Sequence, residues 1–301
     1  ERSSVSTNGT QGDGHSHLLD ISSDGRYVLF SSTATNLVPN DTNGIEDLFV
    51  HDHETQITER VNVSTTGLEA NALSSSPNGA EISDDGRFVT FTSAATSLVD
   101  HDNDPSPDVF VRDRQSNTTA CVSCIWNEPT HYVLGNGGSL SDSGRYIAYA
   151  IQNVPTYECG DQIAIYDLQF GDTSLIPFCG VVVEGQSAYS FGGFLQVSDS
   201  GRYVLYNTFA PFPSGEHLWI FDRQTTQFEL VSVNSNEIPA NGPSGSTSMS
   251  SDGRYIVFAS WGDNLIDNDT NGMPDVFVRD RQTGTTERIS VGQRGEELTN
   301  E

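Results

Sequence analysis

Five copies of one short turn recur along this 301-residue chain, each with Gly-Arg and an aromatic residue following small or acidic residues. Their arginines are Arg26, Arg87, Arg145, Arg202 and Arg254, spaced 61, 58, 57 and 52 residues apart. A nearly fixed period of this size indicates tandem copies of one structural unit. Any fold assigned to the chain must therefore divide it into five similar parts.

The fifth copy predicts the internal structure of one unit. Residues 246–250 are expected to form a short strand, and Asp252-Gly253 is typical of a tight hairpin turn. Residues 254–260 and 275–281 are rich in aromatic and β-branched residues, as strands are, and residues 285–291 supply a fourth strand. Each unit is therefore expected to be a four-stranded antiparallel meander.

The third strand of that unit shows how the units must pack. Val276, Phe277 and Val278 are consecutive apolar residues, so both faces of the strand are expected to be covered. Four-stranded sheets stacked radially meet this requirement. The sequence thus predicts an all-β, five-bladed β-propeller in one domain, residues 1–301, with blades near residues 15–64, 76–124, 136–180, 192–233 and 245–292.

These repeats resemble a known family. The pattern in residues 22–38, 47–52 and 58–64 is similar to that of the TolB-like β-propeller repeat family, and the resemblance covers essentially the whole chain. Copies one, two and five match closely, whereas copies three and four keep the turn and lose the loop motif. The resemblance implies a propeller that serves as a scaffold, a periplasmic interaction module or, in some branches, a platform for polysaccharide-degrading enzymes.

Both ends of the chain carry the sequence pattern of a fourth strand. Residues 1–6 match the fourth strand of a repeat at residues 59–64, and residues 287–292 match it again. Five copies of the first three strands are thus accompanied by six copies of the fourth, which predicts one spare terminal strand. That strand could lie on an edge, the chain could be part of a longer array, or the strand could pair with a neighbouring copy and produce oligomers or filaments.

The charge of the chain restricts its partners and its location. There are 41 acidic residues and 14 basic ones, every basic residue is Arg, and the formal net charge is -27. Such a surface repels nucleic acid and anionic membranes, and no apolar run approaches the ~20 residues of a membrane span. Four cysteines and a first residue other than Met favour a secreted or extracellular protein, or a periplasmic one.

The loops between the second and third strands carry the strongest chemical signal. Their short oxygen-bearing side chains alternate around a glycine and resemble the first half of a calcium-binding EF-hand loop, without its final glutamate. We expect structural calcium in these loops, although the same residues also form ordinary turns. The candidate ligands are Asp267, Asp269, Asn271 and Asp275 in copy five, Asp100, Asp102, Asp104 and Asp108 in copy two, and Asp41, Asn43 and Asp47 in copy one.

The cysteines are expected to form disulfides. Cys159 and Cys179 flank the last two strands of copy three, where a bridge between them could replace the missing ion. Cys121 and Cys124 form a C-x-x-C pair, which favours a local disulfide or two separate partners over a zinc site, because no matching second pair is present.

No catalytic motif stands out. The recurrent arginines are interpreted as ion-pair partners between neighbouring blades, and His131-Tyr132 has no adjacent base that would make it a catalytic pair. We therefore predict a non-catalytic, calcium-stabilised module that binds other proteins or copies of itself. The alternative is a polysaccharide lyase, glycosidase or lectin that binds a glycan on the central face of the propeller.

Overall fold

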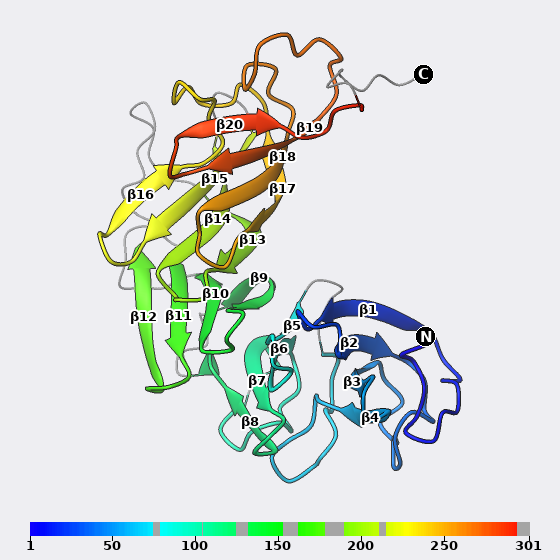
Figure 1. Cartoon of the computed structure of the whole chain (residues 1–301). Helices are drawn as coiled ribbons and strands as arrows, with labels where there is room; N and C mark the ends of the chain where they lie inside the picture. The colour runs from blue at the N-terminus through cyan, green and yellow to red at the C-terminus, as the bar shows by residue number, and fades with distance from the viewer. Residues whose placement is uncertain are drawn as a thin grey trace. The chain divides into compact units, whose positions relative to one another are not determined.

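The described part of the chain is built from β-strands joined by turns and loops. The computed structural model describes residues 1–74, 79–103, 105–124, 132–152, 162–177, 190–210 and 215–293. In these ranges the chain forms twenty strands arranged as five antiparallel four-stranded sheets, each made of consecutive strands (Figure 1). We call each sheet a blade and number the blades in chain order. The prediction of five four-stranded repeats is confirmed.

The first three blades lie in one compact unit, Glu1–Ile176. Blade one contains β1 (Ser16–Ile21), β2 (Tyr27–Ser32), β3 (Asp47–Asp52) and β4 (Ile57–Arg60). Blade two contains β5 (Ala80–Ile82), β6 (Phe88–Ser93), β7 (Asp108–Asp113) and β8 (Thr118–Cys121). Blade three contains β9 (Tyr132–Leu140), β10 (Tyr146–Gln152), β11 (Gln162–Asp167) and β12 (Asp172–Pro177).

The other two blades lie in a second compact unit, Pro177–Glu301. Blade four contains β13 (Ser190–Val197), β14 (Tyr203–Ala210), β15 (Gly215–Asp222) and β16 (Gln227–Leu230). Blade five contains β17 (Ser244–Met249), β18 (Tyr255–Ser260), β19 (Asp275–Asp280) and β20 (Thr285–Arg288). The four strands expected in copy five are all present, although the fourth ends three residues earlier than predicted.

The recurrent Gly-Arg turn closes the first hairpin of every blade. In blade one the Tyr27 N–H donates to the Ser22 hydroxyl at 2.9 Å, and Gly25 has a φ of +73° that favours glycine. Arg26 makes two hydrogen bonds to Asp52, of 2.9 and 2.7 Å, at the end of β3 in the same blade.

The same arginine pairing recurs in every blade. The partners of the other four arginines are Asp113 for Arg87, Asp167 for Arg145, Asp222 for Arg202 and Asp280 for Arg254. The recurrent arginines therefore tie each blade to itself. The expectation that they pair between blades is wrong, because the turn that carries each arginine lies beside the third strand of its own sheet.

Neighbouring blades share an apolar core within each unit. Leu48 and Val50 of β3 pack with Ile82, Phe91 and Phe110 of blade two, and all five residues are at most 7% exposed. Equivalent clusters join blade two to blade three and blade four to blade five. Burial of such side chains, worth about 1.5–3 kcal/mol each, is what holds one sheet against the next.

A second contact between blades combines an aromatic ring, a glycine and an ion pair. A Cβ added at Gly86 would lie 2.1 Å from the Tyr27 ring, so that ring packs directly on the glycine of the next turn. Arg114 of blade two covers the same ring, with its guanidinium carbon 4.7 Å from the ring centroid, and pairs with Glu59 of β4 at 2.5 Å. We call this four-residue contact the clasp.

The clasp recurs in the second unit. Tyr203 of blade four packs on Gly253 of blade five, where an added Cβ would lie 2.4 Å from the ring. Arg281 covers the Tyr203 ring at 4.5 Å and pairs with Glu229 of β16 at 2.7 Å. Phe88 and Gly144 make the ring-on-glycine part of the contact between blades two and three.

The segments after β4 and β16 each reach the next blade through a hydroxyl group. Thr65 accepts a 3.0 Å hydrogen bond from the Thr119 N–H, and Ser235 accepts one of 2.9 Å from the Thr286 N–H. Thr7 does the same for the Thr58 N–H at 3.1 Å. We call this contact the latch.

The latch explains the repeat-like sequence at the N-terminus. Residues 1–6 form no strand, apart from one bridge between Val5 and Gln11 that matches the Val63–Glu69 bridge in sequence position. The segment predicted to be a spare strand is thus a latch segment. In the matching repeat, β4 ends at Arg60, which corresponds to Arg2. The structure differs here from the sequence prediction because the matching residues, 59–64, lie mostly beyond β4.

Replacing Gly86 by Ala tests the clasp, with Gly25→Ala as the matched control. Both glycines have a φ near +70°, so both variants should lose about 1–2 kcal/mol of stability from backbone strain. Only at Gly86 does the new methyl group overlap a ring, because nothing except Ile21 Cδ1, at 4.0 Å, lies near Gly25. Denaturant unfolding of the dilute protein should show a further loss of roughly 1–3 kcal/mol for Gly86→Ala. Equal losses in the two variants would contradict the clasp.

Candidate metal-binding loops and buried carboxyl groups

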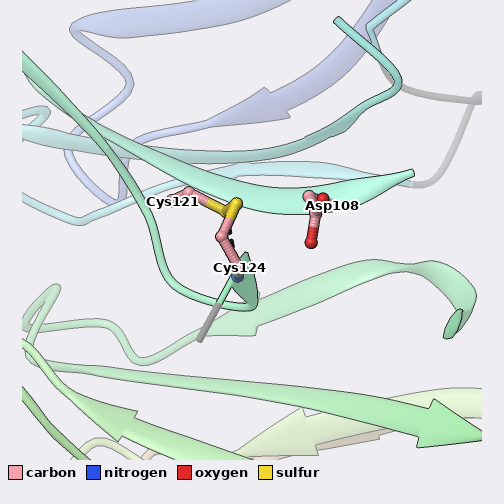
Figure 2. Close-up of side chains that lie close together, drawn as sticks. All are labelled: Asp108, Cys121 and Cys124. Carbon is pink, nitrogen blue, oxygen red and sulfur yellow. Dashed lines mark hydrogen bonds between the residues drawn. A yellow bond between two sulfur atoms is a disulfide. The ribbon is translucent and has the colours of Figure 1, made fainter. Parts of the chain in front are cut away.

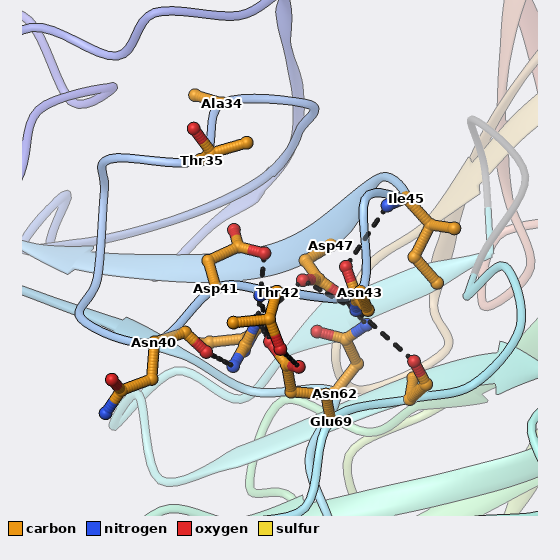
Figure 3. A network of polar contacts seen from close by, with 12 residues as sticks. Ala34, Thr35, Asn40, Asp41, Thr42, Asn43, Ile45, Asp47, Asn62 and Glu69 are labelled. Carbon is orange, nitrogen blue, oxygen red and sulfur yellow. Dashed lines mark hydrogen bonds and ion pairs between the residues drawn. The ribbon is translucent and has the colours of Figure 1, made fainter.

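An acidic cluster gathers at the loop of blade one between β2 and β3 (Figure 3). Asp41 comes from the loop, Asp47 begins β3, and Glu69 comes from the segment that follows β4. Their carboxylate oxygens lie within 4.8 Å of one another, an arrangement that could hold a metal ion. Asp41 and Asp47 were candidate ligands from the sequence, whereas Glu69 was missed because it is distant in the chain.

An arginine already provides positive charge to this cluster. Arg60, the last residue of β4, places Nη1 at 3.4 Å from Asp41, 2.8 Å from Asp47 and 2.7 Å from Glu69. The Arg60 side chain is only 8% exposed, so these pairs are shielded from water. One guanidinium faces three carboxylates, and the cluster therefore retains negative charge that a bound cation would offset.

Asn43 makes hydrogen bonds within the loop, and its predicted role as a ligand stays a prediction. Its Nδ2 donates to Asp47 at 3.0 Å and to the Ala70 carbonyl at 3.2 Å. Its Oδ1 accepts a hydrogen bond of 3.1 Å from the Ile45 N–H, which is the pattern of an Asx turn. The amide thus shapes the loop and donates to the cluster, and the three carboxylates supply the charged oxygens that a metal ion would bind.

The pKa values of Asp41 and Glu69 are shifted in opposite directions. Burial raises the pKa of Asp41, and the neighbouring Asp47 carboxylate raises it further. For Glu69, burial acts in the same direction, but hydrogen bonds from Thr42 and Arg60 outweigh it and hold its pKa at about 2. The stabilisation from Glu69 is present above its unfolded pKa of 4.5 and is lost as the pH falls toward 2.

Blade five repeats the arrangement of blade one. Arg288 lies 2.9 Å from Asp275, and the two groups are almost fully buried. It lies 3.7 Å from Asp269, which occupies the position of Asp41. Asn271 donates to Asp275 at 3.5 Å and accepts from the Met273 N–H, as Asn43 does in its loop. The fourth candidate ligand, Asp267, is exposed at the start of this loop.

Blade two departs from that arrangement at one position. Cys121 stands where β4 and β20 end in arginine, and it forms a disulfide with Cys124 (Figure 2). Asp108 lies beside this disulfide and accepts a hydrogen bond from the Ser123 hydroxyl. Asp102 is 5% exposed, and position 121 carries no guanidinium group.

The remaining predicted site residues are one described aspartate, three residues outside the described ranges, and the Cys121–Cys124 pair. Asp100 is exposed at the start of the blade-two loop. The neighbouring candidate Asp104 lies outside the described residues, as do Cys159 and Cys179, so their predicted roles stay predictions. The local disulfide between Cys121 and Cys124 is present in the structure.

A different set of side chains joins the first strands of neighbouring blades. The Asp20 carboxylate on β1 accepts a hydrogen bond of 2.8 Å from the Ile82 N–H of β5. Glu81 on β5 accepts one of 2.6 Å from the Leu140 N–H of β9. In the second unit, Gln196 occupies the same position and accepts from the Met249 N–H at 2.8 Å. The sequence gives no sign of this position, because an acidic residue near a strand end is usually exposed to solvent.

Glu81 is the most strongly perturbed of these groups. Desolvation of its carboxyl group raises its pKa to about 8, although part of the Glu81 residue remains accessible. The Leu140 N–H lowers the pKa, and the Asp20 and Asp142 carboxylates raise it. Burial likewise raises the pKa of Asp20, and the Asp84 and Asp142 carboxylates act in the same direction.

Replacing Glu81 by Gln should remove a pH dependence of stability. The folded protein holds a proton on Glu81 up to about pH 8, whereas the unfolded chain releases it near 4.5. Wild-type stability should therefore fall as the pH rises from about 4.5 to 8, because the folded state binds more protons. Glu81→Gln keeps the acceptor, as Gln196 does in blade four, and should flatten that slope in denaturant unfolding. A slope identical to that of the wild type would contradict this assignment.

Replacing Arg60 by Met tests the internal cation. The variant leaves three carboxylates without their guanidinium, and removal of one partner of a buried ion pair costs about 3–5 kcal/mol of unfolding free energy. The loss should shrink toward pH 4, where the carboxyl groups take up protons. Arg2→Met removes an exposed arginine and serves as the control. Chemical unfolding in calcium-free buffer is the measurement, and equal stability of both variants would show that Arg60 is dispensable.

The comparisons with known proteins support the fold. Neither a protein-family model nor a curated protein sequence matches the chain. An oligogalacturonate lyase in complex with manganese aligns with a TM-score of 0.60 and 12% identity, over 93% of this chain and 67% of that chain. A putative TolB from Agrobacterium tumefaciens aligns with a TM-score of 0.52 and 15% identity, over 92% and 81% of the two chains.

A third structure is a domain of a larger enzyme. The β-propeller domain of the trilobed protease from Pyrococcus furiosus, described as having an open velcro topology, aligns with a TM-score of 0.51 and 12% identity, over 92% of this chain and 75% of that chain. Identities this low bear on fold and leave activity open. The chain is thus structurally similar to TolB-like and oligogalacturonate lyase β-propellers, in agreement with the resemblance found in its repeats.

Proposed function

We propose that this chain is a non-catalytic, calcium-stabilised β-propeller that acts as a structural or protein-interaction module outside the cytoplasm. The observation that carries the proposal is the use of its ionic groups. Arg26 and its four counterparts fasten hairpins, Arg114 and Arg281 fasten neighbouring blades, and Arg60 and Arg288 fasten loops. Ionic groups used in this way maintain the scaffold.

The buried histidines support the same conclusion. His51 is fully buried on β3 and bonds to the Thr58 hydroxyl at 2.8 Å. His217 on β15 is 5% exposed, and its Nδ1 lies 3.4 Å from the Ser232 hydroxyl. Burial lowers the pKa of both imidazoles, which keeps them neutral inside their sheets. A general acid or base must reach the proton that it transfers, and these two rings are enclosed by protein.

The blade-two loop is the best candidate for calcium among the three predicted loops. Blades one and five place a guanidinium beside the strand-three aspartate, whereas blade two has Cys121 at that position. Calcium prefers carboxylate and carbonyl oxygens, which Asp102 and Asp108 would supply together with Asp100 and Asp104. The ion would provide there the positive charge that Arg60 provides in blade one.

The composition and the disulfide support the proposed location and partners. A disulfide such as Cys121–Cys124 persists in oxidising compartments. A net charge of -27 disfavours nucleic acid as a partner and favours cations and basic protein surfaces. Within the described ranges, no helix has the length and hydropathy that crossing a membrane requires.

Calcium binding is tested by thermal and chemical unfolding with calcium or with excess chelator. At a free calcium concentration one hundred times its Kd, the folded state should gain about 2.7 kcal/mol. Asp102→Asn should abolish most of this gain, whereas Asp269→Asn, at the matching position in blade five, should preserve it because Arg288 remains. Unfolding that is indifferent to both calcium and chelator would refute the calcium part of the proposal.

The carbohydrate-active alternative is tested directly. An oligogalacturonate lyase shares this fold, so oligogalacturonates with and without manganese are the first substrates to assay. A new absorbance from unsaturated products, or glycan binding in calorimetry, would replace the proposed function with an enzymatic or lectin role. The proposal predicts neither signal.

A further inference from the structure

The two middle residues of the C-x-x-C segment hold that segment in blade two. Val122 is fully buried, its N–H donates to the Val109 carbonyl at 2.8 Å, and its carbonyl accepts a hydrogen bond of 2.9 Å from the Tyr149 hydroxyl. Ser123 is 4% exposed, and its hydroxyl accepts a hydrogen bond of 2.9 Å from the Val109 N–H. These contacts are made by backbone and hydroxyl groups, so the position of the segment does not require the disulfide.

Three metal-ligating groups meet at this segment (Figure 2). The sulfur atoms of Cys121 and Cys124 and a carboxylate oxygen of Asp108 lie within 4.8 Å of one another. Asp108 begins β7 and Cys121 ends β8, so the antiparallel pairing of these two strands brings the groups together. The cysteine pair thus gains a third ligand from the neighbouring strand, without a second cysteine pair.

Hydrogen bonds already orient two of these groups. The Ser123 hydroxyl donates to Asp108, and the Cys124 N–H donates to the Cys121 sulfur at 3.1 Å. An N–H donor favours the charged thiolate over the neutral thiol. In metal sites, ligating carboxylates are likewise hydrogen-bonded to outer groups, and loss of such a partner typically costs about 10–100-fold in metal affinity. The three ligating groups therefore have the outer contacts of a metal site.

Two other blades place a positive charge at the matching position. Arg60 ends β4 with Nη1 at 2.8 Å from Asp47, and Arg288 ends β20 with Nη1 at 2.9 Å from Asp275. Cys121 is the last residue of β8 and the equivalent of both arginines. A cation bound to the Cys121 sulfur would therefore stand beside the strand-three aspartate, as the guanidinium does in blades one and five.

The ligand types select the cation. Thiolates are soft ligands that bind zinc, whereas calcium takes oxygen ligands. The C-x-x-C spacing is that of zinc-binding cysteine pairs, and zinc also accepts a carboxylate oxygen. Two thiolates and one carboxylate supply three protein ligands and leave the fourth tetrahedral position to water. Since thiolates form only after the disulfide is broken, the site belongs to the reduced protein.

We propose that reduction of the Cys121–Cys124 disulfide converts this part of blade two into a zinc site, with both sulfurs and the Asp108 carboxylate as ligands. A dithiol supplies two electrons and two protons: it becomes a disulfide as the Cys121–Cys124 bond breaks and two thiols form. Zinc then displaces the two thiol protons to solvent and forms two Zn–S bonds and one Zn–O bond. This inference goes beyond the proposed function, which concerns calcium and the oxidised protein.

Titration with cobalt(II) tests the site, because cobalt(II) substitutes for zinc and shows sulfur-to-metal charge-transfer absorption when thiolates bind it. The full chain is reduced with dithiothreitol, freed of the reductant by anaerobic gel filtration, and titrated with cobalt and then with zinc. The reduced wild type should develop the charge-transfer bands, zinc should remove them, and the oxidised protein should show none. A reduced wild type without these bands would overturn the proposal.

The other two cysteines of the chain provide a matched control. The double variant Cys121→Ser, Cys124→Ser should lose the bands, whereas the double variant Cys159→Ser, Cys179→Ser should keep them. Each variant removes two thiols, so the comparison identifies the pair that binds the metal. Bands that persist in the first variant, or disappear in the second, would assign the metal to the other pair and contradict the proposal.

Variants that keep both cysteines test the carboxylate. Ser123→Ala removes the hydroxyl that donates to Asp108 and should weaken zinc binding about 10–100-fold, and Asp108→Asn should weaken it at least as much. Ser116→Ala is the control, because Ser116 is an exposed serine of the same blade that contacts Thr118. Zinc affinity is measured in the reduced protein by competition with a chromophoric chelator, and wild-type affinity of Asp108→Asn would overturn the proposed ligand set. Calcium binding is measured in the oxidised protein, so failure of the proposed function and failure of the zinc site are distinguishable.

Discussion

The packing of an aromatic ring on a glycine is the contact on which the succession of blades depends. The glycine has a positive φ that closes its own hairpin, and its missing side chain admits the ring of the preceding blade. One residue type thereby satisfies a local and a long-range requirement at once. At Gly86, Gly144 and Gly253 this double role gives a physical reason for the Gly-Arg-aromatic turn to recur even where loops diverge.

The scarcity of basic residues determines how the remaining contacts are made. With 14 arginines for 41 acidic residues, each guanidinium has to serve several acceptors. Arginine suits this because its planar fork binds a carboxylate with two parallel hydrogen bonds, which lysine cannot do. The consequence is visible in Asp113, whose pKa the bidentate Arg87 holds at about 2. Such carboxylates remain ionised in the folded state, and their contribution to stability is lost only in strong acid.

The sequence predicts the strands correctly but does not show which distant residues pack around them. β7 and β19 have the same six residues, DVFVRD, yet Val109 is fully buried and Val276 is 36% exposed. Val109 packs in the core that blade two shares with blade three, a contact made by residues distant in the chain, and no local pattern contains that information. Glu69 and Glu81 were missed for the same reason, since the groups that perturb them come from distant segments of the chain.

The replacement of a loop arginine by Cys121 shows how one repeat can change its source of positive charge. In all three loops a side chain that follows the fourth strand donates a hydrogen bond to the aspartate at the start of the third strand. The donors are Asn62, Ser123 and Ser290, and the respective acceptors are Asp47, Asp108 and Asp275. That hydrogen bond is neutral on the donor side, so it leaves the charge of the aspartate in place. Blades one and five offset the charge with an arginine of their own. Blade two has a disulfide at that position, which fixes the chain without supplying charge, in keeping with the calcium ion proposed for its loop.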